Sequence, residues 1–230
     1  MNRRILSILL VPAFAIGAAI YSGCLANPTM TAAVKDYMPV AVGNYWCYDW
    51  IDYSGVSPVT SYQRWLVQTE EVKDGQSAFK VEKRYSISAC PTSGASFNEY
   101  WFDNDSDFQI NQTAYTDCKW VTYFKYPPVE NVAWTSNCAS SGTTKFDFKT
   151  RARESVTLNY DNHTYPNCGH VELTQTDTSG SIVTTYLYAT WYAPGIGAIK
   201  MEKTDKTGNS ATFNKVIARG ELISTNVTGK

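Results

Sequence analysis

The sequence has few of the features that mark an enzyme or a nucleic-acid-binding protein. Its 230 residues carry a formal net charge of −1, and without the basic pair Arg3–Arg4 there are 18 basic and 21 acidic residues. A basic face for nucleic acid is therefore not expected. The chain has 2 histidines, no Gly-x-Ser-x-Gly nucleophile motif and no Cys-x-x-Cys pair. We predict that the protein is not an enzyme and that it needs no cofactor.

Long apolar runs and helical patterns are also scarce. After residue 24 no segment is apolar for long enough to span a bilayer. Outside the first residues, no stretch repeats its apolar side chains with the 3.6-residue period of a helix. Aromatic residues reach 14 %, led by 16 Tyr and 7 Trp, and with abundant Thr and Val they favour β-strands. The length suits one domain with a sizeable core or two small lobes, and we predict a single domain.

The first stretch of the chain has the pattern of an export signal. Arg3–Arg4 provide a basic start, residues 5–20 are uncharged and apolar, and Ser22–Gly23 are small. The small pair directly before Cys24 resembles the lipobox of bacterial lipoproteins, although Tyr21 stands where that motif usually has an aliphatic residue. The resemblance implies that residues 1–23 are a signal peptide and that Cys24 is acylated.

Two alternatives for this leader stay open, namely ordinary cleavage after Ala26 and a single membrane anchor. The apolar run is short for an anchor, and no basic stop-transfer flank follows it. Residues 24–36 are small and polar, as expected of a tether, and residues 37–230 form the predicted β domain. Acylated Cys24 would attach the protein to a membrane of the cell envelope. The triacylated cysteine of bacterial lipoproteins satisfies the need for more than one acyl chain, and the expected location is the outer membrane, facing the periplasm or the cell surface.

The remainder of the chain is a series of alternating strands and tight turns. The clearest alternation covers residues 143–158, and turn signals stand at Asp74–Gly75, Ser179–Gly180 and residues 207–209. One face of the segment 143–158 is expected to hold Phe146, Phe148, Thr150, Ala152, Val156 and Leu158. Successive hairpins predict an all-β antiparallel meander with at most one short helix. Because a wide flat sheet has exposed edges, we expect the meander to curl into a half-barrel, barrel or sandwich.

Six cysteines suit an exported protein, because disulfides form in oxidising compartments. They are Cys24, Cys47, Cys90, Cys118, Cys138 and Cys168. Acylation and ordinary cleavage both leave five, an odd number, and the pairing cannot be deduced from sequence. Our preferred disulfides are Cys118–Cys138, because the stretch between them can fold back on itself, and then Cys47–Cys90. Cys168 is then the expected free thiol.

Three phrases resemble those of bacterial envelope lipoproteins. Residues 37–48 are similar to the opening "Y-x-P-L-x-x-G-N-x-W-x-Y", residues 164–171 to "T-F-x-N-C-x-x-V", and residues 191–200 to "W-Y-A-P-G-V-G-L-V-K". Residues 158–163 depart from the Pro-Ala-Gly turn of the second phrase. The resemblance implies a β-rich periplasmic or surface domain and brings no known reaction. In the third phrase, Gly195 and Gly197 also predict a turn whose backbone closely approaches a neighbour.

The densest group of chemically active side chains lies in the second phrase. Cys168, His170 and Glu172 would share one face of a strand, which is an acceptable start for a metal site. A thiolate pair of Cys168 with a histidine is the corresponding enzymatic hypothesis. The lipoprotein resemblance already accounts for Cys168, and a cysteine buried in a strand is more common than a reactive one. We therefore expect no metal site and no catalysis here.

The abundance of Tyr and Trp leads to the functional prediction. A curved sheet with an aromatic concave face is suited to an apolar or amphipathic ligand. We predict a lipid-anchored binding module of the cell envelope, loosely similar to the half-barrels that carry lipids and lipoproteins across Gram-negative envelopes. The alternative is a structural or assembly partner of an envelope protein, with a filled interior and a large exposed apolar patch.

Overall fold

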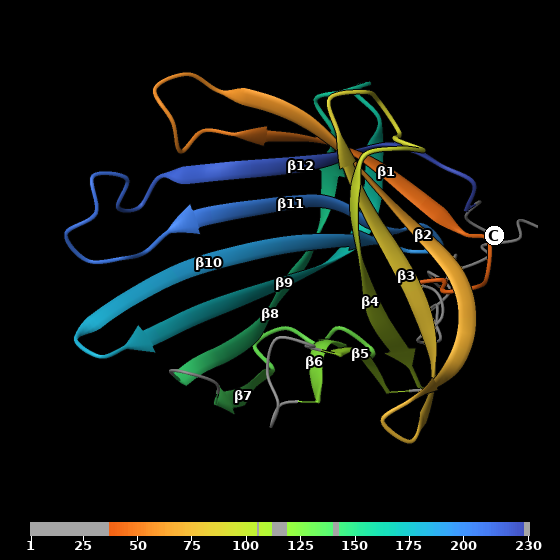
Figure 1. Ribbon diagram of the computed structural model, residues 1–230, viewed down its shortest axis with the longest axis horizontal. Helices are drawn as coiled ribbons and strands as arrows, with labels where there is room; N and C mark the ends of the chain where they lie inside the picture. Colours follow the sequence, from red (N-terminus) through yellow and green to blue (C-terminus); the bar gives the residue numbers. More distant parts are fainter. Residues whose placement is uncertain (1–36, 105, 112–118, 140–142, 228–230) are drawn as a thin grey trace, which may run out of the picture. The chain divides into compact units, whose positions relative to one another are not determined.

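The computed structural model describes residues 37–104, 106–111, 119–139 and 143–227, which belong to the compact unit Thr31–Lys230 (Figure 1). The expected signal peptide and tether lie outside these residues. Within them, no helix is long and apolar enough to cross a membrane. The strands are β1 (Tyr45–Asp52), β2 (Val59–Lys73), β3 (Gln76–Ser86), β4 (Ala95–Asp103), β5 (Asp107–Asn111), β6 (Trp120–Lys125), β7 (Ala133–Ala139), β8 (Thr143–Thr157), β9 (Thr164–Ser179), β10 (Ile182–Ala193), β11 (Gly197–Asp205) and β12 (Val216–Thr225). The predicted all-β fold is confirmed.

All of these strands belong to one antiparallel sheet. Its order is β6-β5-β4-β3-β2-β1-β12-β11-β10-β9-β8-β7. Sequential neighbours pair within β1–β6 and within β7–β12, and the first strand pairs with the last, with Trp46 opposite Thr225. The predicted meander is therefore confirmed. The pairing of its two ends makes β6 and β7, which are consecutive in the chain, the two edges of the sheet.

The sheet curves into a nearly closed barrel, and side chains bridge the two edge strands. The indole Nε1 of Trp134 on β7 donates a hydrogen bond to the backbone oxygen of Thr122 on β6, at 2.7 Å. The Lys125 ammonium lies 5.3 Å from the centroid of the Trp134 ring, and that ring stacks on Phe148 with centroids 5.2 Å apart. These contacts cover a seam that backbone pairing leaves open.

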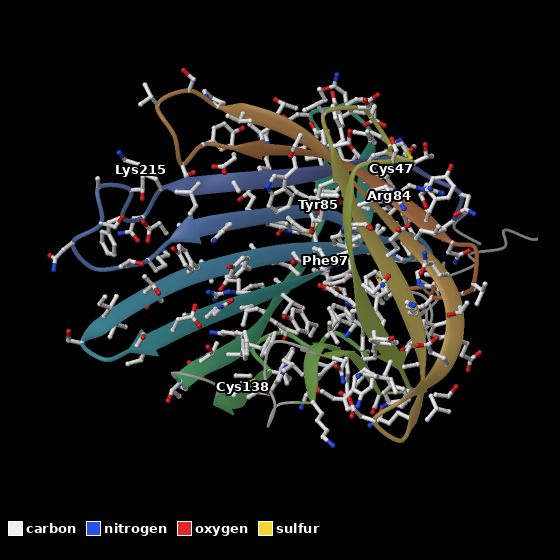
Figure 2. All side chains as sticks on the ribbon, viewed as in Figure 1. Cys47, Arg84, Tyr85, Phe97, Cys138 and Lys215 are labelled. Atoms are coloured by element: carbon white, nitrogen blue, oxygen red, sulfur yellow. A yellow bond between two sulfur atoms is a disulfide. The ribbon has the colours of Figure 1, made fainter. Side chains whose placement is uncertain are left out.

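Alternation places several large aromatic side chains on the inner face of the sheet. Trp46 and Tyr48 of β1, Trp65 of β2, Trp101 of β4 and Phe124 of β6 are all buried. Figure 2 shows side chains projecting into the space between β3–β4 and the strands β9–β12. The half-buried strands expected from a period of two are therefore present.

The long strand β8 departs from the expected alternation at one residue. Phe146, Phe148 and Thr150 are buried as predicted, whereas Ala152 is exposed. The register with β9 shifts between Arg151 and Glu154 and again before Val156. Such bulges add a residue to one strand and turn the following side chains to the other face. The placement of Ala152 on the buried face was therefore wrong.

Two further details differ from the pattern-based expectation. Residues 103–112 are polar and indicate turns or an edge strand, but β5 lies there between β4 and β6 and buries Phe108 and Ile110. Ile87 continues the alternating apolar pattern of Phe79, Val81 and Tyr85 in the sequence, but it is 87 % exposed, because β3 ends at Ser86. Burial of two apolar side chains outweighs the polar composition around β5.

Candidate functional site

The inner face encloses a cavity of about 370 Å³ between the two halves of the sheet. Strands on both sides of the seam contribute to its wall, which is dominated by aromatic and aliphatic side chains. The lining residues are Met38, Trp50, Gln63, Trp65, Lys83, Tyr85, Trp101, Phe108, Ile110, Tyr123, Phe148, Val171, Leu173, Gln175, Tyr188, Ala189, Thr190, Tyr192, Ala198, Met201 and Glu202. Because these residues are spread from position 38 to position 202, only the closed sheet brings them together.

Trp101 occupies the centre of the buried wall. It is 1 % exposed, and its ring lies 5.9 Å from Trp46, 5.8 Å from Trp65 and 5.4 Å from Phe108, centroid to centroid. Its indole Nε1 donates to Glu99 Oε2 at 3.1 Å. Tilted and edge-on aromatic pairs of this kind hold one another in place, so the wall is preformed.

Polar groups at the buried end of the wall already have partners. Lys83 Nζ lies 2.7 Å from Glu99 Oε2 and 4.3 Å from the centroid of Trp65. Gln63 Oε1 accepts a hydrogen bond from the Trp65 indole at 3.2 Å. Lys83 is the residue that interrupts the apolar alternation of its strand, and that interruption is the sequence signal for its position in the wall. Because these groups are already paired, the surface offered to a ligand is mainly apolar.

On three strands, β9, β10 and β11, the lining residues change from buried to half-exposed in the same direction. On β10 the change runs from Tyr192 to Tyr188, on β9 from Leu173 to Gln175, and on β11 from Ala198 towards Met201. All three changes run towards the ends of the β9–β10 and β11–β12 hairpins. The cavity therefore has a buried apolar end and a more polar, accessible end.

Aromatic side chains and Lys203 lie next to the accessible end of the cavity. The Lys203 ammonium lies 3.8 Å from the centroid of Tyr186 and 5.4 Å from that of Tyr188, and burial lowers the pKa of Lys203. On the opposite side, Tyr85 stacks on Phe97 with centroids 5.6 Å apart (Figure 2). Burial, helped by the charge of Glu99, raises the pKa of Tyr85, so its hydroxyl stays neutral at physiological pH.

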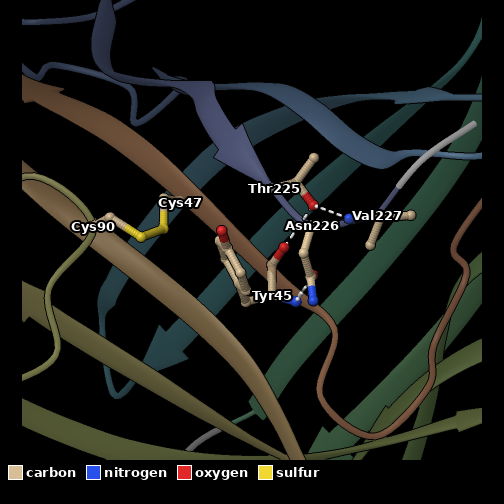
Figure 3. The surroundings of a disulfide bond; sticks show 6 residues. All are labelled: Tyr45, Cys47, Cys90, Thr225, Asn226 and Val227. Carbon is tan, nitrogen blue, oxygen red and sulfur yellow. Dashed lines mark hydrogen bonds between the residues drawn. A yellow bond between two sulfur atoms is a disulfide. The ribbon is translucent and has the colours of Figure 1, made fainter.

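The cysteines expected to form disulfides are distributed as follows. Cys47 on β1 and Cys90 in the β3–β4 connection form a disulfide with Cα atoms 5.0 Å apart (Figure 3). The bond ties the β3–β4 connection to β1, which lies between β2 and β12 in the sheet. Nearby, the backbone N–H of Tyr45 donates a hydrogen bond to Asn226 Oδ1 at 2.8 Å. Cys138 is buried on β7, and its expected partner Cys118 lies outside the described residues. The Cys118–Cys138 pairing stays a prediction, as does acylation of Cys24.

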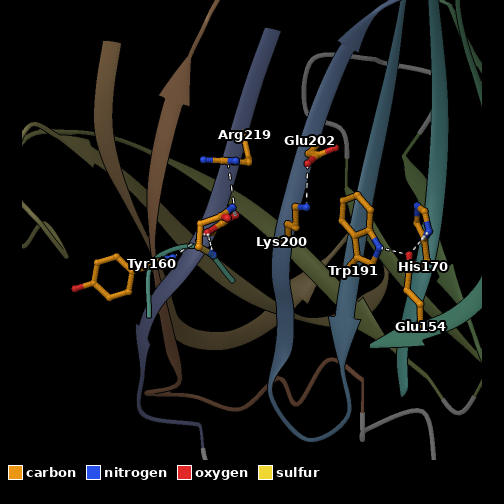
Figure 4. A network of polar contacts seen from close by, with 9 residues as sticks. Glu154, Tyr160, His170, Trp191, Lys200, Glu202 and Arg219 are labelled. Carbon is orange, nitrogen blue, oxygen red and sulfur yellow. Dashed lines mark hydrogen bonds and ion pairs between the residues drawn. The ribbon is translucent and has the colours of Figure 1, made fainter. Parts of the chain in front are cut away.

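The three candidate metal ligands lie on the outer face of β9, and each contacts a different partner; Figure 4 shows His170 beside Glu154. Cys168 donates to the backbone oxygen of Tyr165 at 3.3 Å, His170 Nδ1 lies 3.0 Å from Glu154 Oε1, and Glu172 lies 2.5 Å from Arg151. In the part of the chain that the structure describes, no three His, Cys, Asp or Glu side chains are arranged to hold a metal ion. The strand thus carries separate structural contacts.

The protonation states of His170 and Cys168 also do not suit nucleophilic or acid–base catalysis. The His170 ring stacks on Trp191 with centroids 4.4 Å apart, and the Trp191 indole donates to Glu154 Oε1 at 2.6 Å. Burial lowers the pKa of His170 in spite of the neighbouring Glu154 and Glu172. Burial raises the pKa of Cys168 to about 12. A neutral thiol and a neutral imidazole do not form the thiolate pair that nucleophilic catalysis requires.

Cys168 is accordingly expected to resist alkylation in the folded protein. At about pH 8, a pKa of about 12 leaves on the order of one thiol in ten thousand ionised, whereas the unfolded thiol, near pKa 8.5, is roughly one quarter ionised. Iodoacetamide labelling with peptide mapping, in buffer and in guanidinium chloride, measures the difference. Equal labelling rates in the two conditions would contradict the prediction.

The departure at residues 158–163 has a structural role on the outer face. The backbone N–H of Asn159 donates to Glu221 Oε2 at 2.7 Å, and its side-chain amide donates to Oε1 at 2.6 Å. The N–H of Tyr160 adds a 3.3 Å hydrogen bond to the same carboxylate, and Arg219 Nε lies 3.6 Å from it (Figure 4). Buried Glu221 therefore fixes the β8–β9 connection against β12. The sequence offered no local signal for this contact, because 62 residues separate Glu221 from Asn159.

The fold and the cavity define a class of domain in which a curved antiparallel sheet surrounds an internal apolar space. Solved structures of other proteins have a similar fold. A protein of Parabacteroides distasonis, assigned by inference as a lipoprotein, is 14 % identical with a TM-score of 0.55, and the match covers 83 % of this chain and 98 % of that one. A protein of Bacteroides fragilis, assigned by inference as exported and with a YmcC-like fold, is 9 % identical with a TM-score of 0.47 over 83 % and 99 % of the chains. No family model and no curated protein matches the sequence. At 14 % identity, the first likeness establishes the fold alone.

Proposed function

We propose that this protein is an exported β domain of the cell envelope that binds an apolar or amphipathic ligand inside its curved sheet. The cavity of about 370 Å³ is the observation that carries the proposal. It lies within the range of roughly 300–1,000 Å³ that is typical of ligand sites. It also exceeds the roughly 150 Å³ of an engineered apolar cavity that binds benzene.

The arrangement of the wall favours an elongated ligand with two unlike ends. Buried Trp101, Phe148 and Leu173 offer an apolar surface at one end. Gln175 and Glu202, which are half-exposed, add polar atoms at the other end. An amphipathic molecule can bury its apolar part and leave its polar group near water. The alternative function, an assembly partner without a ligand, requires a filled interior, which the cavity does not favour.

Export and anchoring belong to the same proposal. The basic and apolar leader before Cys24, the Cys47–Cys90 disulfide and the likeness to a protein assigned as a lipoprotein support a periplasmic or surface location. Acylated Cys24 would hold the domain at a membrane, with the outer membrane as the proposed site. The three lipoprotein-like phrases support membership of that envelope class.

Native mass spectrometry of the full chain, extracted gently from its envelope, tests the ligand proposal. We expect a retained apolar molecule, and we expect the purified chain to enhance the fluorescence of N-phenylnaphthylamine. Leu173→Trp should abolish both signals, because the larger ring fills the cavity. Val72→Trp is the matched control, since Val72 is 77 % exposed and lies at the far end of β2. A parent protein that is consistently empty and binds no probe would overturn the proposal.

A further inference from the structure

Three hairpin ends lie side by side at one end of the sheet. The β1–β2, β11–β12 and β9–β10 connections are neighbours because β12 pairs with both β1 and β11, and β11 also pairs with β10. Figure 1 shows them projecting together at the left, in orange, blue and cyan. We call these three ends the hairpin rim, consisting of residues 53–59, 180–183 and 206–216.

The hairpin rim carries an unusual share of exposed apolar side chains. Six of the thirteen large apolar residues that are exposed in the described chain lie on it. Among them, Ile182 is 68 % and Phe213 is 48 % exposed. The other members are Val56, Val59, Val183 and Val216. Scattered exposed apolar residues need no explanation, but their concentration on three adjacent loop ends indicates a contact surface.

The charge of the hairpin rim is positive. Its residues include Lys206 and Lys215 and no Asp or Glu. The Lys206 ammonium donates to Asn214 Oδ1 at 2.8 Å and that of Lys215 to the Ala211 oxygen at 3.5 Å, so both hydrogen-bond to uncharged groups. Lys215 directly precedes β12, and its exposed side chain projects outward from the base of the β11–β12 hairpin (Figure 2). The acidic group next to Lys206, Asp205, is buried.

The neighbouring carboxylate of Asp205 is turned inward. It accepts hydrogen bonds from the hydroxyls of Ser210 and Thr212, and these bonds hold the pKa of Asp205 well below its usual range. Its role is to fix the β11–β12 connection, which presents Phe213 and the two lysines. Asp52, directly before the first rim segment, is exposed and accepts a hydrogen bond from the Ser54 N–H at 2.7 Å. The rim is thus apolar and carries two lysines, with one carboxylate at its border.

The hairpin rim lies beyond the accessible end of the cavity, five residues further along each of β9, β10 and β11, which is about 17 Å. The half-exposed wall residues Tyr188, Gln175 and Met201 lie on the rim side of the buried ones along β10, β9 and β11. A ligand that leaves the cavity in this direction arrives at the rim. Separate loop ends with single apolar side chains suit insertion among lipid headgroups, whereas a protein interface needs a continuous packed centre.

We propose that the hairpin rim docks on an anionic lipid surface. Ile182, Phe213 and their apolar neighbours would enter the headgroup region, and Lys206 and Lys215 would attract acidic lipids. An apolar ligand could then pass between the bilayer and the cavity along the half-exposed ends of β9, β10 and β11. This last step rests on the proposed ligand-binding function, whereas docking itself does not.

Vesicle flotation of the full exported chain with Cys24→Ser, which cannot be acylated, tests the docking. We expect binding to phosphatidylcholine vesicles that contain phosphatidylglycerol, weaker binding to phosphatidylcholine alone, and release by salt. The double variants Ile182→Ser/Phe213→Ser and Lys206→Gln/Lys215→Gln should each lose at least about tenfold in affinity. The matched controls are Val42→Ser/Val72→Ser and Lys119→Gln, which change exposed residues away from the rim.

Each outcome decides the proposal. Selective loss in the rim variants, with their bound ligand retained in native mass spectrometry, supports lipid docking independently of the cavity. Equal loss in rim and control variants would overturn it. Failure of the parent chain to float with either vesicle would also overturn it, and recovery of one envelope protein by crosslinking at Phe213 would then assign the rim to a protein partner.

Discussion

Replacing Trp101 by alanine is expected to lower the free energy of unfolding by about 3–5 kcal/mol. The side chain is 1 % exposed and contacts three other buried aromatic rings. Its removal forfeits the transfer free energy of the indole and leaves a larger void, because Trp46 and Trp65 are held by strands that cannot close on it. Guanidinium chloride unfolding followed by circular dichroism measures the change.

A neighbouring aromatic residue provides the control for this prediction. Phe97 lies on the same strand, β4, but is 46 % exposed. Phe97→Ala should cost about 1 kcal/mol, because a half-exposed ring buries less apolar surface on folding. Trp101→Phe should fall between the two. If Trp101→Ala and Phe97→Ala destabilise the protein equally, the central role assigned to Trp101 is wrong.

Removing the Cys47–Cys90 disulfide is expected to cost about 2–4 kcal/mol of stability. The two cysteines are 43 residues apart, so the bond closes a long loop and restricts the unfolded chain, for which the chain-entropy estimate is about 4 kcal/mol. The loop contains all of β2 and β3, so the bond also holds the β3–β4 connection in the native state. The guanidinium chloride concentration at the midpoint of unfolding should therefore decrease.

The double variant Cys47→Ala/Cys90→Ala is the correct form of this experiment. A single substitution leaves a reactive partner thiol, and a reducing agent would act on every disulfide of the chain. Cys168→Ala is the matched control, because Cys168 is buried and free, and it should cost only the packing of one sulfur. A double variant as stable as the parent would show that the bond does not contribute to folding stability.

Local sequence pattern predicted the strands and turns of this protein well. The alternation in residues 143–150 and the turn signals at Asp74–Gly75 and Ser179–Gly180 correspond to β8 and to tight hairpins. The close backbone approach expected at Gly197 is also present. Its φ is +109°, and an added Cβ would lie 2.9 Å from the Trp46 indole nitrogen. The strands and turns depend on neighbouring residues, which is why a single sequence suffices to predict them, whereas the contact of Gly197 with Trp46 is set by the fold.

Other features of the site could not be predicted from pattern alone. The shift of alternation after Arg151 depends on a bulge whose register is set by the partner strand. Burial of β5 depends on Phe108 and Ile110 meeting Trp101 across the sheet, a contact that local polarity obscured. Lys83 was recognisable as an interruption in an apolar face, but its carboxylate partner Glu99 lies on the next strand.

The sequence by itself determined that this chain forms antiparallel strands with one wet and one aromatic face, because the period of two and the turn residues act over a few positions. Only the tertiary structure decided that β1 pairs with β12, that Trp134 bridges the seam, and that the aromatic face encloses a cavity. The β1–β12 pairing and the cavity wall join residues more than one hundred positions apart, and Trp134 meets Thr122 across the two edges of the sheet. They follow from the burial of apolar surface by the whole curved sheet, which no local pattern encodes.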